Sequence, residues 1–229
     1  MRAVDASFEP PKRGDRVVVV SPHFDDGVLS LGAAMHTWAR TGARVELLTV
    51  LACDPASDAP AGGWDARGGF ATEGESARER RLEDLAACAV LGVAPVWLPY
   101  GSVDYDRHGD DAEVADAVLA AVEGPDLVLL PGSPVSHPDH RWLVDTLHGH
   151  DAFARLRRGF YAEQPYATRS GERPPGFLAL PRDAKGQLAK WRAIRSYRSQ
   201  LPLLALGELR RGAHVVAWQP ELVSERVPE

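Results

Sequence analysis

The chain has 229 residues, of which 45% are hydrophobic and 25% are charged, a balance that excludes wholesale disorder. Its 26 basic residues face 32 acidic ones, and the net charge of −6 argues against a binder of nucleic acid or anionic membranes. Cys53 and Cys88 are too few for a disulfide framework or a cysteine-rich zinc site. Because the N-terminus has no apolar signal region and no apolar run reaches about 20 residues, we expect a cytoplasmic protein without a membrane span.

The first fifty residues predict a strand, a helix and a second strand. Residues 15–21 (DRVVVVS) are a β-branched run typical of a strand buried on both faces. A polar turn follows, and then apolar residues recur at helical spacing from Val28 until Gly42, which we expect to cap the helix. Residues 45–51 (VELLTVL) complete a β-α-β unit, the building block of a parallel sheet.

The same alternation continues along the chain. The pattern predicts helices over 75–91, 110–122 and 184–201, and strands over 95–99, 125–131, 159–163 and 213–218. We find no linker and therefore expect a single domain over 1–229. This order of elements indicates a three-layer α/β fold, Rossmann-like and doubly wound, with a mostly parallel sheet and helices on both faces.

One long segment, 54–74, has no periodicity and directly follows the second predicted strand. A loop of roughly 20 residues in a compact domain is usually functional or disordered. In an open α/β sheet, ligands bind at the carboxyl edge of the strands, where this segment begins. Its Trp64 and Phe70 suit a lid that packs on a ligand, although a surface loop whose aromatic side chains fill a gap has the same pattern.

A cluster of possible metal ligands follows the first strand. His23, Asp25 and Asp26 lie within four residues, and His23 and Asp26 are spaced to converge on one ion across a turn. A mixed nitrogen and oxygen ligand set suits zinc. Two adjacent carboxylates repel each other, so we expect one to bind the metal and the other to act as a base. Capping of the following helix would explain one of the two aspartates, but not the histidine as well.

A second cluster, Ser136-His137-Pro138-Asp139-His140, follows the fourth predicted strand. Because parallel strands end at the same sheet edge, the two clusters can meet in space. Together they offer His23, Asp26 and one of His137 or His140 as three ligands. A fourth position is left for water, as in catalytic rather than structural zinc sites. The remaining histidine is a candidate acid or electrostatic stabiliser.

These two motifs, PHFDDGVLSLGAAM from Pro22 and SHPDHRWLVD from Ser136, resemble those of the PIG-L/LmbE-type zinc-dependent N-deacetylases. The resemblance covers about residues 15–202. Weaker matches are Arg80 with Glu83, Ala86, Leu91-Gly92-Val93, Tyr161 with Glu163 and Pro165, and Lys190 with Tyr197, Ser199 and Gln200.

The resemblance implies Zn²⁺ on His23, Asp26 and His140, with Asp25 as general base and His137 as general acid or oxyanion stabiliser. The sequence departs from the family pattern at two positions. Phe24 replaces the usual proline, and Gly27 replaces a frequent acidic residue. Neither is a ligand, so we expect the chemistry to persist. We expect Gly27 to leave extra room beside the metal.

The resemblance also implies the reaction, removal of an N-acetyl group from an amino-sugar conjugate to give a free amine and acetate. The expected partner is a small N-acetylated molecule. Arg67, Asp104 and Glu163 lie near the functional edge and are the candidates for binding it. Two alternatives stay open: an amidase that cleaves another N-acyl or thiol-conjugate amide, and a non-catalytic binding module with a vestigial site.

Overall fold

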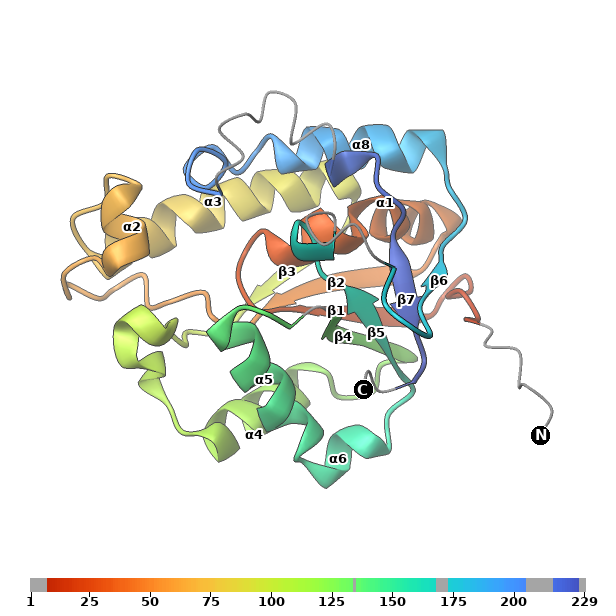
Figure 1. The fold of residues 1–229 in the computed structure, drawn as a ribbon, viewed down its shortest axis with the longest axis horizontal. Helices are drawn as coiled ribbons and strands as arrows, with labels where there is room; N and C mark the ends of the chain where they lie inside the picture. The colour runs from red at the N-terminus through yellow and green to blue at the C-terminus, as the bar shows by residue number, and fades with distance from the viewer. Residues whose placement is uncertain (1–7, 134, 168–172, 205–215, 227–229) are drawn as a thin grey trace.

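The computed structural model describes residues 8–133, 135–167, 173–204 and 216–226, whose strands form one seven-stranded sheet in the order β3-β2-β1-β4-β5-β7-β6 (Figure 1). Neighbouring strands from β3 to β5 are parallel, whereas β7 is antiparallel to both β5 and β6. The predicted doubly wound, mostly parallel sheet is therefore confirmed. The strands are β1 (Arg16–Ser21), β2 (Arg44–Thr49), β3 (Ala94–Trp97), β4 (Leu127–Ser133), β5 (Arg158–Ala162), β6 (Leu178–Ala179) and β7 (Leu222–Ser224).

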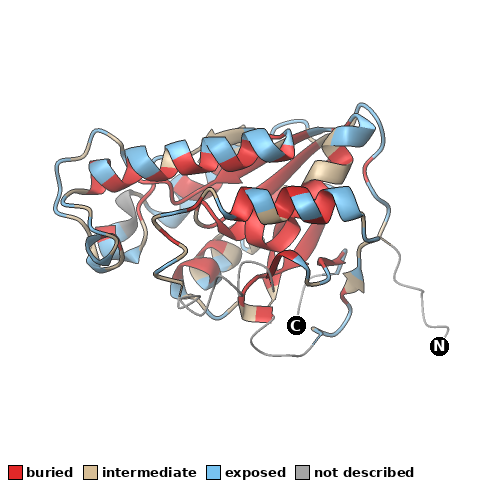
Figure 2. Ribbon diagram, turned by 90° about the horizontal axis from the view of Figure 1, so that it is seen from above, coloured by how far each residue is buried: buried red, intermediate tan, exposed pale blue. Residues whose placement is uncertain are grey.

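Helices cover both faces of the sheet, so the molecule has three layers (Figure 1). One face carries α1 (Asp26–Thr41), α3 (Glu73–Leu91) and α8 (Ala184–Ile194). The other carries α4 (Asp111–Ala121), α5 (Pro138–His148) and the short α6 (Asp151–Ala154). Figure 2 shows the helices buried where they face the sheet and exposed on the outside. Every helix in the described part of the chain is too short or too polar to span a bilayer.

The valines of β1 show why this strand lies at the centre. Successive side chains of a strand point to opposite faces of its sheet. Val17 and Val19 pack in the apolar cluster beneath α1, α3 and α8, and Val18 and Val20 pack in the cluster on the α4 and α5 side. A continuous apolar run is therefore what a strand with two covered faces requires.

Helix α1 is interrupted in its middle, where Leu31 has the non-helical angles φ −127° and ψ 15°. The backbone N–H groups of Ala33 and Ala34 donate instead to the two carboxylate oxygens of Glu221, at 2.9 and 2.7 Å. The Glu221 carboxylate is paired in turn with Lys190 Nζ at 2.8 Å, and Lys190 is fully buried. This buried ion pair therefore caps the second half of α1, the helix that begins in the turn after β1.

Two of the predicted elements differ from the structure by more than two residues. The helix expected over 184–201 ends at Ile194. The last strand, expected over 213–218, is wrong within the described residues, because Val216 and Ala217 are helical and the strand is β7. Residues 213–215 lie outside the described residues. Helix α5, which starts in the second histidine motif, was not predicted, and neither were α6 and β6.

Candidate active site

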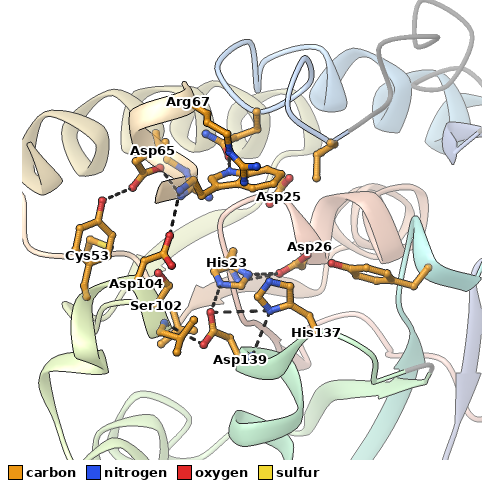
Figure 3. Close-up of a pocket in the computed structure, with 18 residues that line it drawn as sticks. His23, Asp25, Asp26, Cys53, Asp65, Arg67, Ser102, Asp104, His137 and Asp139 are labelled. Carbon is orange, nitrogen blue, oxygen red and sulfur yellow. Dashed lines mark hydrogen bonds and ion pairs between the residues drawn. The ribbon is translucent and has the colours of Figure 1, made fainter. Parts of the chain in front are cut away.

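Two turns meet at the carboxyl edge of the sheet, between β1 and β4. β1 pairs with β2 on one side and with β4 on the other, so the strand order reverses at this point, where open α/β sheets bind ligands. The turn after β1 carries His23, Asp25 and Asp26, and the first turn of α5 carries His137 and His140. Figure 3 shows His23, Asp25, Asp26 and His137 around one cavity.

The start of α1 leaves both aspartates free of capping. Asp25 stands at the N-cap position, but its side chain accepts no capping hydrogen bond. The hydroxyl of Ser21 accepts the N–H of Gly27 instead, at 2.9 Å. Oδ2 of Asp26 turns back to accept the backbone N–H of His23 at 2.9 Å. Helix capping therefore does not account for this pair of carboxylates.

Three donor atoms converge in the turn. Oδ2 of Asp26 lies 3.2 Å from Nδ1 of His23 and 3.1 Å from Nε2 of His140, and the two ring nitrogens are 3.2 Å apart. Donor atoms about 2.0–2.1 Å from a tetrahedral zinc ion are separated from one another by about 3.3 Å. The spacing and the donor types thus fit zinc on His23, Asp26 and His140.

His137 belongs to a second, looser donor set. Its ligand atom and those of His23 and His140 all lie within 4.8 Å of one another. Nδ1 of His137 accepts the backbone N–H of Asp139 at 3.2 Å, so the proton of the neutral ring is on Nε2. A protonated Nε2 has no lone pair to offer a metal. Of the two sets, the one with Asp26 therefore fits zinc better.

His23 and His140 each have a carboxylate beside the ring nitrogen that faces away from Asp26. Nε2 of His23 lies 3.2 Å from Oδ2 of Asp139, and Nδ1 of His140 lies 3.0 Å from Oε2 of Glu163. Such carboxylates fix the tautomer and orientation of metal-binding histidines. Asp139 is itself held by the N–H of Val103, which donates to its Oδ1 at 3.1 Å. Neither of these contacts has a local signal in the sequence, because the partners are 116 and 23 positions apart.

The two adjacent aspartates have opposite electrostatic environments. Burial, and then the neighbouring Asp26, raise the pKa of Asp25 to about 6. Burial also acts to raise the pKa of Asp26, but His140 and His23 outweigh it and hold this pKa well below its usual value. Burial, and then His23 and His140, lower the pKa of His137 to about 4. Asp26 is thus the permanent anion, Asp25 an acceptor poised near neutral pH, and His137 a neutral ring.

The cavity above these residues has a volume of about 260 Å³. Arg67 and Asp104, expected to bind substrate, both line it. Glu163 does not lie where we expected it: its side chain is 1% exposed and lies behind His140. Half of the remaining lining residues are apolar or aromatic, namely Leu51, Trp64, Val103, Tyr105, Tyr166 and Leu204, and the others are Cys53, Asp65, Arg80, Ser102, Asp139 and Gln200.

The segment 54–74 contains a short helix, α2 (Gly63–Arg67), where we expected no regular structure. Trp64 of this helix lines the cavity, and its indole N–H donates to Oε1 of Gln200 at 2.8 Å. The Trp64 backbone N–H donates to Oδ2 of Asp104 at 3.1 Å. Arg67 stacks on the Trp64 ring, 5.0 Å from its centroid. The segment therefore forms one wall of the cavity, and Trp64 is the aromatic residue that does so.

The two departures from the family pattern lie away from the cavity. A Cβ on Gly27 would come within 2.5 Å of Cδ1 of Leu47, in the core. The expectation that Gly27 leaves room beside the metal is therefore wrong, since close packing against β2 already takes up that space. Phe24 is 1% exposed, and the guanidinium of Arg80 lies over its ring, 5.1 Å from the centroid.

The sequence profile of the family described as "PIG-L: GlcNAc-PI de-N-acetylase" matches residues 18–147, more than half of the chain and both motifs. No curated protein sequence matches the chain significantly.

Several solved structures share the fold. A triple mutant of the deacetylase Orf2 from the teicoplanin biosynthetic pathway is 27% identical, with a TM-score of 0.75 over 91% of this chain and 96% of that one. The A40926 pseudoaglycone deacetylase Dbv21 is 25% identical, with a TM-score of 0.71 over 95% and 100% of the two chains. The N,N′-diacetylchitobiose deacetylase of Pyrococcus horikoshii, 20% identical with a TM-score of 0.61 over 88% and 76%, supports the fold alone. With its profile match and this fold, the chain belongs to the PIG-L family of de-N-acetylases.

Proposed function

We propose that this protein is a zinc-dependent hydrolase that removes the N-acetyl group from an N-acetylglucosamine-type amino-sugar conjugate and releases a free amine and acetate. The observation that carries the proposal is the convergence of Asp26, His23 and His140 at 3.1–3.2 Å, with Asp25 free beside them. The similar structures described as deacetylases in the teicoplanin and A40926 pathways support the reaction class. We further propose that the reaction takes place in the cytoplasm, because both cysteines, Cys53 and Cys88, are free thiols. Cell fractionation tests this location.

We assign the metal to His23, Asp26 and His140. When bound, zinc supplies a Lewis acid that polarises an amide carbonyl and lowers the pKa of water. Asp139 and Glu163 hold the two imidazole rings in the tautomers that direct His23 Nδ1 and His140 Nε2 toward Asp26.

Asp25 is the proposed general base. Its carboxyl lines the cavity, accepts no capping hydrogen bond, and has a pKa of about 6, so it is largely ionised at neutral pH and still basic enough to take a proton. It removes a proton from the attacking water. The proton it has accepted is then available for the nitrogen of the departing amine.

His137 is the proposed electrostatic stabiliser. Its Nδ1 accepts the N–H of Asp139, so its Nε2–H is free to donate to the carbonyl oxygen of the substrate as negative charge develops there. The ring is neutral at pH 7, because its pKa is lowered to about 4. The sequence left the choice between His137 and His140 open without the family resemblance, and this hydrogen bond supports the same assignment.

Arg67 and Asp104 are the proposed substrate contacts. Both line the cavity, Arg67 from α2 and Asp104 from the η1 turn (Val103–His108). The donor groups of Arg67 and the carboxylate of Asp104 suit sugar hydroxyls. Trp64 supplies an apolar surface between them.

The reaction is tested by incubating the zinc-loaded protein with N-acetylglucosamine conjugates that differ only in the aglycone, and measuring primary amine and acetate. Release from at least one conjugate is expected. Hydrolysis of a non-sugar amide alone would end the amino-sugar assignment and leave an amidase. Absence of both stoichiometric zinc and hydrolysis would point to a binding module.

The ligand assignment is tested with two matched variants. His140→Ala is expected to lose zinc, whereas His137→Ala keeps zinc and loses turnover. The opposite result would reverse the roles of the two histidines.

A further inference from the structure

A buried chain of polar groups supports the active-site turn from the side away from the cavity. The hydroxyl of Tyr197 lies 2.9 Å from the backbone carbonyl of Phe24 and 2.7 Å from Oδ1 of Asp84 on α3. Oδ2 of Asp84 accepts the indole N–H of Trp97 at 2.8 Å. Asp84 and Phe24 are 0% and 1% exposed. Phe24 stands between His23 and Asp25, so its carbonyl belongs to the backbone that positions both.

The number of available hydrogens shows which protonation state of Asp84 fits these hydrogen bonds. A tyrosine hydroxyl has one hydrogen to donate, whereas the Phe24 carbonyl and an ionised Asp84 would both need to accept it. One of two buried oxygens would then face the hydroxyl lone pairs at 2.7–2.9 Å with no hydrogen between them. A protonated Asp84 removes the conflict, because it donates to Tyr197, and Tyr197 donates to Phe24.

The charged and titratable groups around Asp84 also favour its protonated form. Burial raises the pKa of Asp84 to about 6, although the hydrogen bonds from Trp97 and Tyr197 oppose the shift. Asp25, from the active-site turn, raises the pKa further, and Arg80, one turn earlier on α3, lowers it. Cys88, one turn later, is buried as a neutral thiol, because burial raises its pKa.

We propose that Asp84 is a buried carboxylic acid whose proton, passed on as a hydrogen bond through Tyr197, holds the Phe24 carbonyl and with it the turn carrying His23 and Asp25. Asp84 and Tyr197 are positioning residues. Ionisation of Asp84 at higher pH breaks the hydrogen bond between Tyr197 and the Phe24 carbonyl. The activity readout below rests on the proposed function, whereas the stability and infrared readouts do not.

Asparagine at position 84 mimics the neutral acid, since its NH₂ donates to Tyr197 while its carbonyl accepts from Trp97. A carboxyl whose pKa rises from 3.8 to about 6 on folding binds more protons in the folded state between those values, so wild-type stability falls as pH rises through them. Asp84→Asn has no such loss. The ratio of its folding equilibrium constant to that of the wild type is expected to rise roughly 10- to 100-fold between pH 4.5 and pH 8.

The measurement is urea unfolding of the zinc-loaded proteins across this pH range, with Asp58→Asn, a substitution of an exposed aspartate, as the control. A ratio that falls with pH for Asp84→Asn would show an ionised, stabilising Asp84 and overturn the proposal. An infrared difference spectrum at pH 5 is expected to contain the band of a protonated carboxylic acid that Asp84→Asn removes. If Asp84→Asn removes no such band, the proposal is also overturned.

Tyr197→Phe tests the positioning role. It is expected to keep zinc and KM and to lower kcat by roughly 10-fold or more, because small displacements of a catalytic group are costly. The kcat of Asp84→Asn relative to that of the wild type is expected to rise between pH 5 and pH 8, because the asparagine amide still donates to Tyr197 where Asp84 is ionised. An unchanged kcat in Tyr197→Phe would refute the positioning role. If the wild type hydrolyses no N-acetyl substrate, the proposed function fails, and the stability and infrared results still decide the state of Asp84.

Discussion

Replacing Glu163 with glutamine is expected to weaken zinc binding by roughly 10- to 100-fold, the usual effect of removing a carboxylate behind a metal-binding histidine. Oε2 of Glu163 lies 3.0 Å from Nδ1 of His140, and both side chains are 1% exposed. Its second oxygen, Oε1, has no hydrogen-bond partner among the described residues. The effect of the substitution therefore runs through His140.

The lower end of this range follows from the hydrogen bond itself. A bond to an ionised acceptor is roughly twice as strong as a neutral one, so the change from carboxylate to amide costs about 1–1.5 kcal/mol. Because 1.4 kcal/mol is about a factor of ten in an equilibrium constant, this loss corresponds to roughly 10-fold. Loss of the fixed tautomer of His140 adds to it and extends the range to about 100-fold.

Zinc affinity is measured by competition with a chromophoric chelator at pH 7.5, alongside kcat and KM. Glu79→Gln, an exposed glutamate on α3, is the control and is expected to change neither. Wild-type zinc affinity in Glu163→Gln would refute the orienting role. A raised KM with unchanged affinity would restore the substrate-binding role that the sequence suggested for Glu163.

Asp25→Asn is expected to keep zinc and the fold and to lose roughly 100-fold or more in kcat, and metal loss in step with activity would make Asp25 a ligand instead. Gly27→Ala is expected to destabilise the protein by about 1–3 kcal/mol with unchanged KM, because its Cβ would approach Leu47 to 2.5 Å. A changed KM with full stability would contradict that packing. Trp64→Leu is expected to raise KM for large conjugates more than for a small N-acetyl amide, and equal effects would leave it outside the substrate-binding surface.

The sequence predicted the position of the site because both motifs directly follow strands of a parallel sheet. The four valines of β1 and the run LVLLP in β4 are strong strand signals, and parallel order brings the ends of both strands to one edge. Histidines and carboxylates placed just after such strands have to meet there. The convergence of His23 and His140 at 3.2 Å follows from topology and not from local spacing.

Contacts between distant segments had no comparable signal. Glu163 follows a strand like the other site residues, and nothing in its neighbourhood distinguishes a carboxylate that faces the cavity from one behind a histidine. The strand at Leu222–Ser224 is only three residues long, whereas AHVVAW has the better β-propensity. Tertiary pairing with β5 made Leu222–Ser224 a strand, whereas Val216 and Ala217 are helical.

The buried ion pair of Lys190 and Glu221 likewise has no local signal in the sequence, because the two residues are 31 positions apart. Lys190 is fully buried beneath α1, where its stem fills the space beside Gly32. Glu221 needs this cation, because its carboxylate is only 5% exposed while it holds the N–H groups of Ala33 and Ala34. Removal of the cation would leave a buried, uncompensated charge at the interruption of α1.

Lys190→Met keeps most of the stem and removes only the charge, so it isolates this contribution. Breaking a buried ion pair by removing one partner costs about 3–5 kcal/mol. For a chain of this size, that corresponds to a fall in Tm of roughly 6–20 °C. Lys185→Met, an exposed lysine on the same helix, is expected to stay within about 0.5 kcal/mol of the wild type, and Lys190→Met combined with Glu221→Gln is expected to recover part of the loss. Thermal and urea unfolding of the three variants measure this loss of stability. If Lys190→Met is as stable as Lys185→Met, Glu221 tolerates burial without its partner, and the expected loss is wrong.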